Sequence, residues 1–278
     1  MATNPFLLSS FDLRHISEYE QDWLRKTIER FGGYPTLEQL WAVMDEIWIQ
    51  LSCDPKIIDD RIAKYYSHPV WLLNGLFIEQ DKQSIEYRNI FTNWVCSQHP
   101  KRVADYGGGF GVLARMIGEA LPHAVIEVIE PHPSRLAVER SLRTKNVSYK
   151  EELSGEYDII IATDVFEHVE DPLKVVADTS AYMSENGRYL IANCFHPVIH
   201  CHLPDTFHFR FSWNATLRAM GLVKFCDLAY GSVFIRSGKL KLDEARVLER
   251  KSQKLWPFVG RIPAFIARPL TRALLSVN

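Results

Sequence analysis

Four glycines that follow an acidic residue are the part of the sequence best suited to bind a cofactor. Asp105 is followed by Gly107, Gly108, Gly109 and Gly111. The apolar run before the glycines, 102–106, is typical of a β-strand, and the stretch after them is typical of a helix. Glycines at such a junction let the backbone turn tightly and let a ligand approach the main chain. We therefore predict a binding loop between a strand and a helix.

A second acidic residue identifies the ligand of this loop. Glu130 ends the next apolar run, nineteen residues after Gly111, where a carboxylate can accept hydrogen bonds from ribose hydroxyls. Asp105 argues against a dinucleotide, because a carboxylate beside a pyrophosphate is unfavourable. S-adenosylmethionine has no phosphate, and its ammonium and sulfonium groups are cations. We predict that this cofactor is bound by Asp105, Gly107, Gly108, Gly109, Gly111 and Glu130.

The elements around these residues predict an α/β fold. From residue 101, apolar β-branched runs alternate with helical stretches, which is typical of a parallel sheet. Strands are expected at 102–106, 124–130, 147–149, 157–162, 187–193, 223–225 and 232–236, with the last two as an antiparallel pair. Helices are expected at 112–121, 134–144, from 172 onward, and 213–220. We predict a seven-stranded, doubly wound, mostly parallel, Rossmann-like sheet.

The regions on either side of this sheet have a different character. Before residue 100 the periodicity predicts helices at 22–31, 36–48, 55–66 and 81–96, and no strands. We predict three segments: an N-terminal helical cap with the acceptor-binding region (1–99), the cofactor-binding core (100–238) and a basic, apolar C-terminal tail (239–278). The tail carries nine Lys or Arg and three acidic residues, which gives it a net charge of +6. The rest of the chain has a net charge of −8.

The order of these motifs resembles a known family. Asp105-x-Gly107-x-Gly109-x-Gly111, Glu130 and then Asp164-x-x-Glu167-His168-Val169-x-Asp171-Pro172 are similar to the class I S-adenosylmethionine-dependent methyltransferases, in the branch that methylates small molecules. The resemblance covers about residues 100–236. It implies that Asp164 lines the methionine and the methyl-transfer site. An Asp after the third strand, often used for the adenine, is replaced here by Glu151 or Glu152.

Two clusters after the fourth and fifth strands are candidates for catalysis. Some metal-dependent relatives hold Mg²⁺ at the positions of Asp164, Glu167 and His168, but polar residues there also fix the loop, and we predict no metal. His168 remains a catalytic candidate. Further along, His196, His200, His202 and His208 crowd the loop that faces the acceptor in this fold. A neutral imidazole can take a proton from a hydroxyl or amine. We predict His196 as the base and His200 as acceptor-facing.

The aromatic run 65–71 in the helical cap has two interpretations. It could line the acceptor pocket beneath a lid, or it could be a buried contact between helices. The acceptor-facing candidates are Tyr65, Tyr66, His68 and Trp71. The tail also has two interpretations: contact with an anionic membrane or lipid-linked acceptor, or packing across the domain or against a second copy in a homodimer. We expect packing.

Composition excludes several classes of protein. Hydrophobic residues make up 47% and charged residues 24% of 278 residues, which excludes a disordered or fibrous chain. The net charge of −2 argues against wholesale nucleic-acid binding. No apolar run approaches the ~20 residues of a membrane span. Five scattered cysteines read as reduced thiols, and with no signal peptide they predict a cytoplasmic location.

We predict a methyltransferase that transfers a methyl group to an O, N or C atom of a small molecule, with a role in biosynthesis. Two alternatives stay open. A nicotinamide-dependent oxidoreductase could use the same sheet, although Asp105 and the lack of a Tyr-x-x-x-Lys pair count against it. A non-catalytic methyltransferase-like subunit is the other, and the intact glycine loop with Glu130 counts against that.

Overall fold

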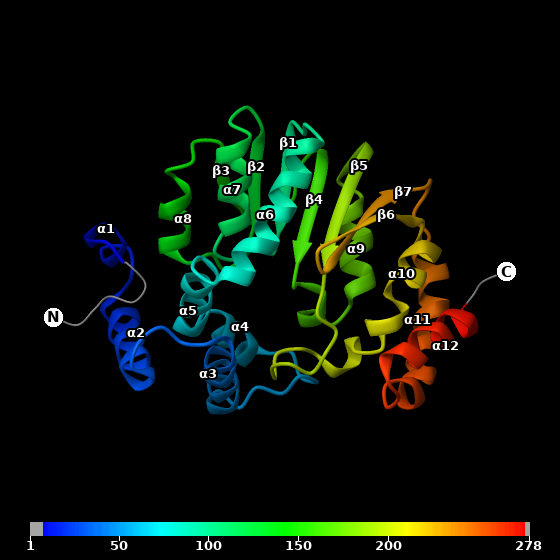
Figure 1. The fold of residues 1–278 in the computed structure, drawn as a ribbon, viewed down its shortest axis with the longest axis horizontal. Coiled ribbons are helices and arrows are strands. Elements are labelled where there is room, and N and C mark those ends of the chain that lie inside the picture. The colour runs from blue at the N-terminus through cyan, green and yellow to red at the C-terminus, as the bar shows by residue number, and fades with distance from the viewer. Residues whose placement is uncertain (1–7, 276–278) are drawn as a thin grey trace. The chain divides into compact units, whose positions relative to one another are not determined.

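A computed structural model describes residues 8–275, and within them seven strands form one sheet (Figure 1). The strands are β1 (Arg102–Tyr106), β2 (Val125–Ile129), β3 (Val147–Lys150), β4 (Tyr157–Thr163), β5 (Met183–Ala192), β6 (Leu222–Leu228) and β7 (Gly231–Arg236). Their order is β3-β2-β1-β4-β5-β7-β6. β2 is parallel to β1 and β3, and β5 to β4, whereas β7 is antiparallel to β5 and β6. The predicted mostly parallel α/β sheet is confirmed, including its antiparallel last pair.

The chain forms two compact units, each of which is described by itself. The first comprises residues 8–152 and 198–201, and the second comprises 153–197 and 202–275. Besides β1–β3, the first unit contains α1 (Ser10–Leu13), α2 (Glu18–Phe31), α3 (Leu37–Gln50), α4 (Asp60–Tyr66), α5 (Pro69–Ile78), α6 (Lys82–Ser97), α7 (Val112–Ala120) and α8 (Arg135–Ser141). The predicted N-terminal helical region is therefore confirmed. The three-segment division at residues 99 and 238 remains a prediction.

Local signals set the ends of the early helices. Ser17 and Thr36 each begin a helix with a capping box. The hydroxyl of the N-cap residue accepts the backbone N–H of the third helical residue, and the side chain of that third residue accepts the backbone N–H of the N-cap residue. Gly32 ends α2 in the left-handed conformation, at φ 70°. The helix expected at 55–66 begins only at Asp60, because the Asp59 side chain accepts the Arg61 N–H and so caps the helix there.

Helix α5 is absent from the sequence-based prediction. Its residues, Pro69–Ile78, are apolar on every side and most of them are buried, so no polar face marks a helical period. The start is nevertheless well formed. His68 is the N-cap, with Nδ1 accepting the Val70 N–H at 3.1 Å, and Pro69 takes the first helical position. A short apolar run of this kind cannot be assigned by periodicity alone.

Strand register brings the two predicted cofactor motifs of the first unit together. Tyr106 at the end of β1 pairs with Ile129 at the end of β2, and the Gly107 N–H donates to the Ile129 carbonyl at 2.8 Å. The glycine loop and Glu130 therefore leave the sheet side by side. In the second unit, Thr163 of β4 pairs in the same way with Ala192 of β5.

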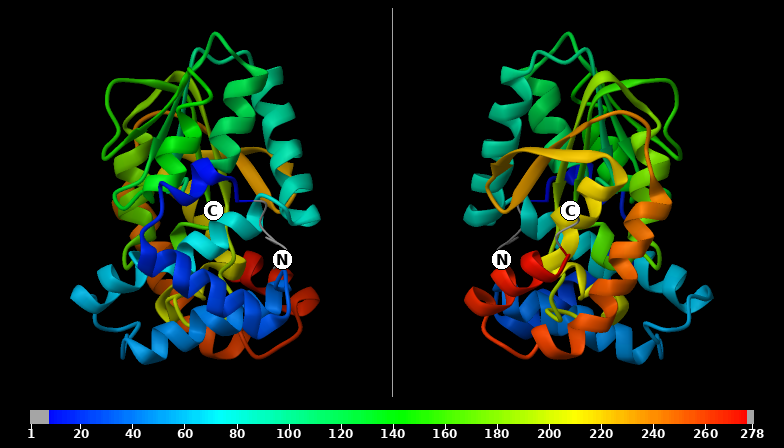
Figure 2. Two further views of the ribbon diagram at one scale, coloured as in Figure 1. Left: turned by 90° about the vertical axis from the view of Figure 1, so that its left-hand side faces the viewer. Right: turned by 90° about the vertical axis from the view of Figure 1, so that its right-hand side faces the viewer.

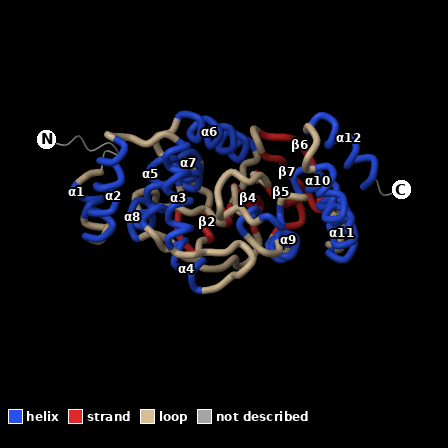
Figure 3. The backbone as a smooth tube through the Cα atoms, turned by 90° about the horizontal axis from the view of Figure 1, so that it is seen from below, coloured by secondary structure: helices blue, strands red, loops and turns tan. Residues whose placement is uncertain are grey.

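The second unit carries its helices mainly after β5. It contains α9 (Pro172–Ser180), α10 (Phe209–Met220), α11 (Leu242–Val259), α12 (Ala264–Leu275) and the short 3₁₀ turns η1 (Phe166–His168) and η2 (Pro204–Thr206). Helices α10, α11 and α12 pack against one another (Figures 2 and 3). The tail thus forms two helices, and the break between them at 260–263 includes Pro263. Pro257 and Pro269 lie inside the helices themselves.

A buried hydrogen-bond cluster fastens the tail to this unit. The Ser252 hydroxyl of α11 lies 2.7 Å from the Ser212 hydroxyl of α10 and 3.1 Å from Nδ1 of His208. Burial lowers the pKa of His208 to about 4, so its ring is neutral and serves packing. No helix within residues 8–275 is both long enough and apolar enough to span a membrane.

Candidate active site

The glycine loop adopts a backbone conformation that requires glycine. Gly107, Gly109 and Gly111 have φ values of 67°, 51° and 68°, in the left-handed region. Gly111 is the N-cap of α7 and provides no side-chain cap, so backbone N–H groups at the start of that helix remain available. The sequence prediction of a tight turn between strand and helix is confirmed by this geometry.

Glu130 is attached directly to this loop. Its Oε2 accepts the Gly109 N–H at 3.1 Å, and its Oε1 accepts the His132 N–H at 3.1 Å. Each carboxylate oxygen can accept more than one hydrogen bond, so both can still receive a hydroxyl donor. The structure therefore holds the half-buried Glu130 in a fixed position beside the loop, as a ribose acceptor would need.

Asp105 lies beneath the loop, only 1% exposed. Burial raises its pKa to about 6; the charge of Arg88 opposes this shift and that of Glu130 adds to it. Its Oδ1 has no hydrogen-bond partner within the described chain. A Cβ on Gly108 would lie 2.7 Å from Cγ of Asp105, so only glycine lets the loop pass this close. A buried carboxylate oxygen without a donor fits a cationic ligand such as S-adenosylmethionine.

Tyr149 of β3 contacts the glycine loop, although the sequence did not indicate it as a site residue. Its hydroxyl donates to the Gly109 carbonyl at 3.0 Å, and a Cβ on Gly111 would lie 2.6 Å from that hydroxyl. Alternation along β3 could have placed this side chain on the loop side of the sheet. Glu151 and Glu152, the residues considered for the adenine, are exposed.

The N-terminal helices also hold the glycine loop. Glu79, which follows α5, forms ion pairs with both Arg115 of α7 and Arg140 of α8. Both guanidinium groups lie over the Phe110 ring, at 5.7 and 5.6 Å, and Arg115 donates to the Phe110 carbonyl at 2.7 Å. Gly75 of α5 packs so closely on this ring that a Cβ would lie 2.5 Å from it. No local pattern in the sequence predicts this long-range contact.

The aromatic run 65–71, at the end of α4 and the start of α5, contributes mainly to the core of the first unit. Tyr65 is fully buried, and its ring meets those of Trp48, Tyr66 and Trp71 at 5.0 to 5.7 Å. His68 lies edge-on to Trp23 at 5.0 Å, and burial lowers its pKa. Packing against these rings thus explains why Tyr65 is buried. Tyr66, His68 and Trp71 are half-buried, and their acceptor role remains a prediction.

The end of β4 is a second cluster of predicted site residues, in the second unit. Asp164 is exposed and has a φ of 54°, a region that few non-glycine residues adopt. Its N–H donates to the Ala192 carbonyl at 2.8 Å, and the Tyr230 hydroxyl donates to its Oδ2 at 2.8 Å. A strained backbone of this kind is common at functional sites, although the cofactor role of Asp164 is still a prediction.

Glu167 in η1 is fully buried and joins several loops. Its Oε1 accepts the Cys194 N–H at 2.7 Å, and its backbone carbonyl accepts the Leu203 N–H at 2.8 Å. Burial, with a contribution from the charge of Asp164, raises the pKa of this carboxyl well above its usual range. Its Oε2 has no hydrogen-bond partner within residues 8–275.

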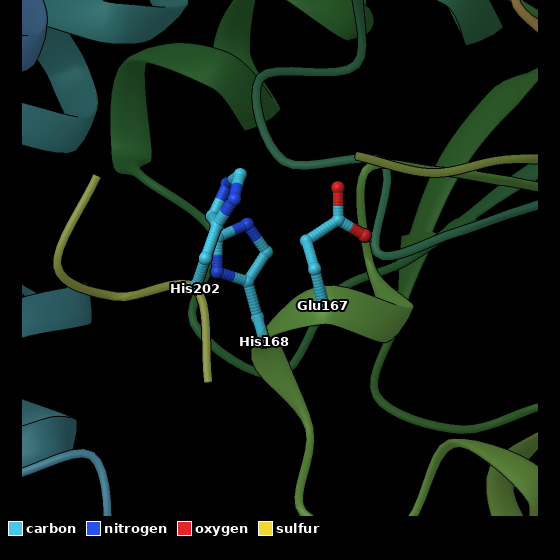
Figure 4. A group of neighbouring side chains, drawn as sticks. All are labelled: Glu167, His168 and His202. Carbon is cyan, nitrogen blue, oxygen red and sulfur yellow. The ribbon is translucent and has the colours of Figure 1, made fainter. Parts of the chain in front are cut away.

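Glu167, His168 and His202 form a group that could hold a metal ion, with their ligand atoms within 4.8 Å of one another (Figure 4). The two imidazole rings meet edge to face, with centroids 4.8 Å apart. Nδ1 of His202 lies 2.7 Å from the His196 carbonyl, so it carries the proton and leaves Nε2 as the acceptor. One carboxylate and two imidazoles suit Zn²⁺ better than Mg²⁺. Asp164, which the resemblance had placed in this group, is not part of it.

The two histidines predicted nearest the acceptor have different surroundings. His196 is half-buried, and burial, followed by the charges of Arg210 and Arg268, lowers its pKa. It is therefore neutral at neutral pH and able to accept a proton. His200, in the first unit, is exposed and contacts Asp45 twice. The backbone N–H of His200 donates to Oδ1 of Asp45 at 2.6 Å, and Nδ1 of the His200 ring lies 2.8 Å from Oδ2 of Asp45.

Comparison with known proteins agrees with these features. Residues 86–213 match the family model of a methyltransferase domain. An O-methyltransferase family protein from Burkholderia thailandensis has a similar fold, with a TM-score of 0.52 and 10% identity over 84% of this chain and 77% of that one. Mitomycin 7-O-methyltransferase gives a TM-score of 0.43 and 15% identity over 69% of this chain and 67% of that one. No match was found among curated proteins.

The doubly wound sheet, the glycine loop and the matched domain together give the class I methyltransferase fold. Residues 86–213 therefore contain a methyltransferase domain, as the resemblance implied, and the structure from Burkholderia thailandensis agrees with this chain in its fold. This assignment favours methyl transfer over the nicotinamide-dependent oxidoreductase and over a non-catalytic subunit.

Replacement of Glu130 by alanine is expected to raise the Kd for S-adenosylmethionine by about tenfold to a hundredfold. The loss corresponds to about 1–3 kcal/mol for donors left without a charged acceptor. Calorimetry on the full chain measures it, with Glu119→Ala, an exposed change on α7, as the control. An unchanged Kd for Glu130→Ala would remove this residue from the cofactor site.

Treatment with EDTA is expected to leave both turnover and the unfolding temperature unchanged. The sulfonium donor needs no Lewis acid, and Glu167 and His202 already have structural partners in Cys194 and His196. Both quantities should be measured before and after chelation, followed by addition of Zn²⁺ or Mg²⁺. A loss that either ion reverses would establish the Glu167–His168–His202 group as a metal site.

Proposed function

We propose that this enzyme transfers the methyl group of S-adenosylmethionine to an O, N or C nucleophile of a small-molecule acceptor in a biosynthetic reaction. The observation that carries the proposal is the arrangement of Asp105 and Glu130 on either side of a glycine loop that only glycine can form. The name of the structure from Burkholderia thailandensis, an O-methyltransferase family protein, supports it.

A small acceptor is favoured by the distribution of charge. Residues 1–238 carry a net charge of −8, so the part of the chain that holds the predicted site has no excess of cations to attract phosphates. We therefore propose no nucleic-acid substrate. We also propose that the helical residues 1–99 supply acceptor-binding surface, since Tyr66, His68 and Trp71 are only half-buried there.

The chain's own residues have separate tasks in the proposed reaction. The bound cofactor supplies a methyl group on a sulfonium, which is already a good leaving group. Glu130 and Asp105 orient the donor, and the rigid glycine loop fixes its position, because alignment is the main contribution an enzyme can make to such a displacement. His196, neutral at neutral pH, takes the proton from a hydroxyl or amine as the new bond forms. Asp164 at the end of β4 and His168 in η1 are the further residues that we propose for cofactor binding and catalysis.

Product analysis tests the proposal directly. The purified chain is incubated with S-adenosylmethionine and a panel of phenols, carboxylic acids, amines and activated carbon acids. We expect S-adenosylhomocysteine to form only with a subset, together with a product one methylene unit heavier than that acceptor. Failure of every class, under conditions in which calorimetry shows the cofactor bound, would contradict a small-molecule acceptor.

We also propose that the enzyme acts in the cytoplasm. All five cysteines are free thiols, which is typical of a reducing compartment. Labelling the native chain with a thiol reagent directly after cell lysis tests this, and the modification of all five cysteines under denaturing conditions is the expected result. Disulfides trapped in that experiment would place the chain in an oxidising compartment.

A further inference from the structure

The outer surface of the C-terminal helices exposes a group of large apolar side chains. Phe258 at the end of α11 is 74% exposed, and Phe265 at the start of α12 is 77% exposed. Ile266, Leu270 and Leu274 follow at 45%, 41% and 51%. Scattered exposed apolar residues are normal, but Ile266, Leu270 and Leu274 recur every four residues along one side of α12, and an exposed apolar stripe of this kind marks an interaction surface.

These side chains are not needed to attach α12 to the protein. The helix is held by a separate face, on which Ala267, Thr271 and Leu275 recur at helical spacing and are buried. Helix α12 contacts both α10 and α11. It therefore has one apolar stripe that packs inward and a second apolar surface that faces outward.

The same segment is strongly basic. Residues 250–275 contain no acidic residue and six basic ones, all of them exposed: Arg250, Lys251, Lys254, Arg261, Arg268 and Arg272. Within the described chain none of the six forms an ion pair with a carboxylate. The segment that carries the exposed apolar side chains thus also carries six exposed cations that form no ion pair among the described residues.

We propose that residues 250–275 form a docking surface for an anionic lipid bilayer. Phenylalanine and leucine side chains can enter the boundary between headgroups and acyl chains, while long arginine and lysine side chains reach the lipid phosphates. A second copy of this chain is a poorer occupant, because two identical surfaces that each carry a net charge of +6 would repel one another. Nucleic acid would use the cations but leave the aliphatic side chains without a partner.

One charge of the docking surface acts on a residue of the predicted active site. The charge of Arg268 in α12 reaches His196 and contributes to the lowered pKa of that imidazole. The inference itself does not depend on the proposed function, because it rests on the exposed side chains and charges of the tail alone.

Vesicle flotation of the full chain tests the docking surface. We expect binding to phosphatidylcholine vesicles that contain phosphatidylglycerol, little binding to pure phosphatidylcholine, and release at high salt. Phe265→Ser with Leu270→Ser should weaken binding to the anionic vesicles about tenfold or more, and Arg261→Gln with Arg272→Gln should do the same. Phe225→Ser is the control, since Phe225 is 56% exposed but lies on β6.

The variants must keep their fold and cofactor affinity for the comparison to count. Because each changed side chain is exposed, the unfolding temperature and the Kd for S-adenosylmethionine should match those of the native chain. Equal binding of all variants to anionic vesicles would overturn the proposal. So would the absence of vesicle binding together with self-association, measured by light scattering, that Phe265→Ser abolishes.

Discussion

Replacement of His196 by alanine is expected to lower turnover by about 10²–10⁴-fold, the usual contribution of a general base. The ring is half-buried, and burial together with the charges of Arg210 and Arg268 favours its neutral form. Since this role concerns the acceptor, the Kd for S-adenosylmethionine should change little. Turnover is measured at saturating cofactor and the Kd by calorimetry, with the exposed His123→Ala as the control.

The pH profile separates a base from a structural role. Protonated imidazole cannot accept a proton, so activity should fall as the pH drops through the pKa of His196. That pKa lies below the ordinary value of 6.5 because the folded environment disfavours the charged ring. The native enzyme should therefore keep full activity at pH 7 and lose it in more acidic buffer. His196→Ala should lack this dependence, and a variant with native turnover and an unchanged profile would contradict the assignment.

The geometry that places Glu130 beside the glycine loop could be predicted from the sequence because its cause is local. A strand, a turn that needs positive φ and a second parallel strand in register are enough to bring Glu130 to the Gly109 N–H. Each of these follows from residue types within one stretch of chain. The burial of Asp105 follows as well, since β1 lies in the middle of the sheet.

Other features depend on contacts between distant segments, which periodicity does not reveal. His202 joins Glu167 and His168 only because the loop after β5 folds back on η1, where the Leu203 N–H meets the Glu167 carbonyl. The assignment of Asp164 to that group therefore had to rest on resemblance alone. Helix α5 was missed for a different reason: an apolar surface on every side leaves no amphipathic pattern.

The tail shows that residue chemistry can be predicted better than conformation. Its basic and apolar character was evident, but the prolines, two of which (Pro257 and Pro269) lie inside α11 and α12, left these helices without a clear local signal. Proline lacks one N–H donor, and packing of the inward face of α12 can offset the loss of a single hydrogen bond. Tertiary contacts therefore outweigh local propensity here.

Replacement of Glu79 by glutamine tests whether the N-terminal helices hold the cofactor loop. Glu79 is 18% exposed and lies between Arg115 and Arg140, which are 12% and 14% exposed. Its loss would leave the partly buried Arg115 without a carboxylate partner, while Arg140 keeps its ion pair with Asp12. We expect a cost of about 3 kcal/mol in the free energy of unfolding. Chemical denaturation measures this quantity.

The same variant should also bind S-adenosylmethionine more weakly, since Arg115 holds the Phe110 carbonyl and both arginines cover the Phe110 ring within the glycine loop. Glu46→Gln is the matched control. It removes another carboxylate that pairs with arginine in this unit, at an exposed site beside Arg30, and should change neither quantity measurably. If Glu79→Gln lowers stability but leaves the Kd intact, the ion network supports the fold alone. If both change while Glu46→Gln has no effect, the helical cap positions the donor site as well as covering the core.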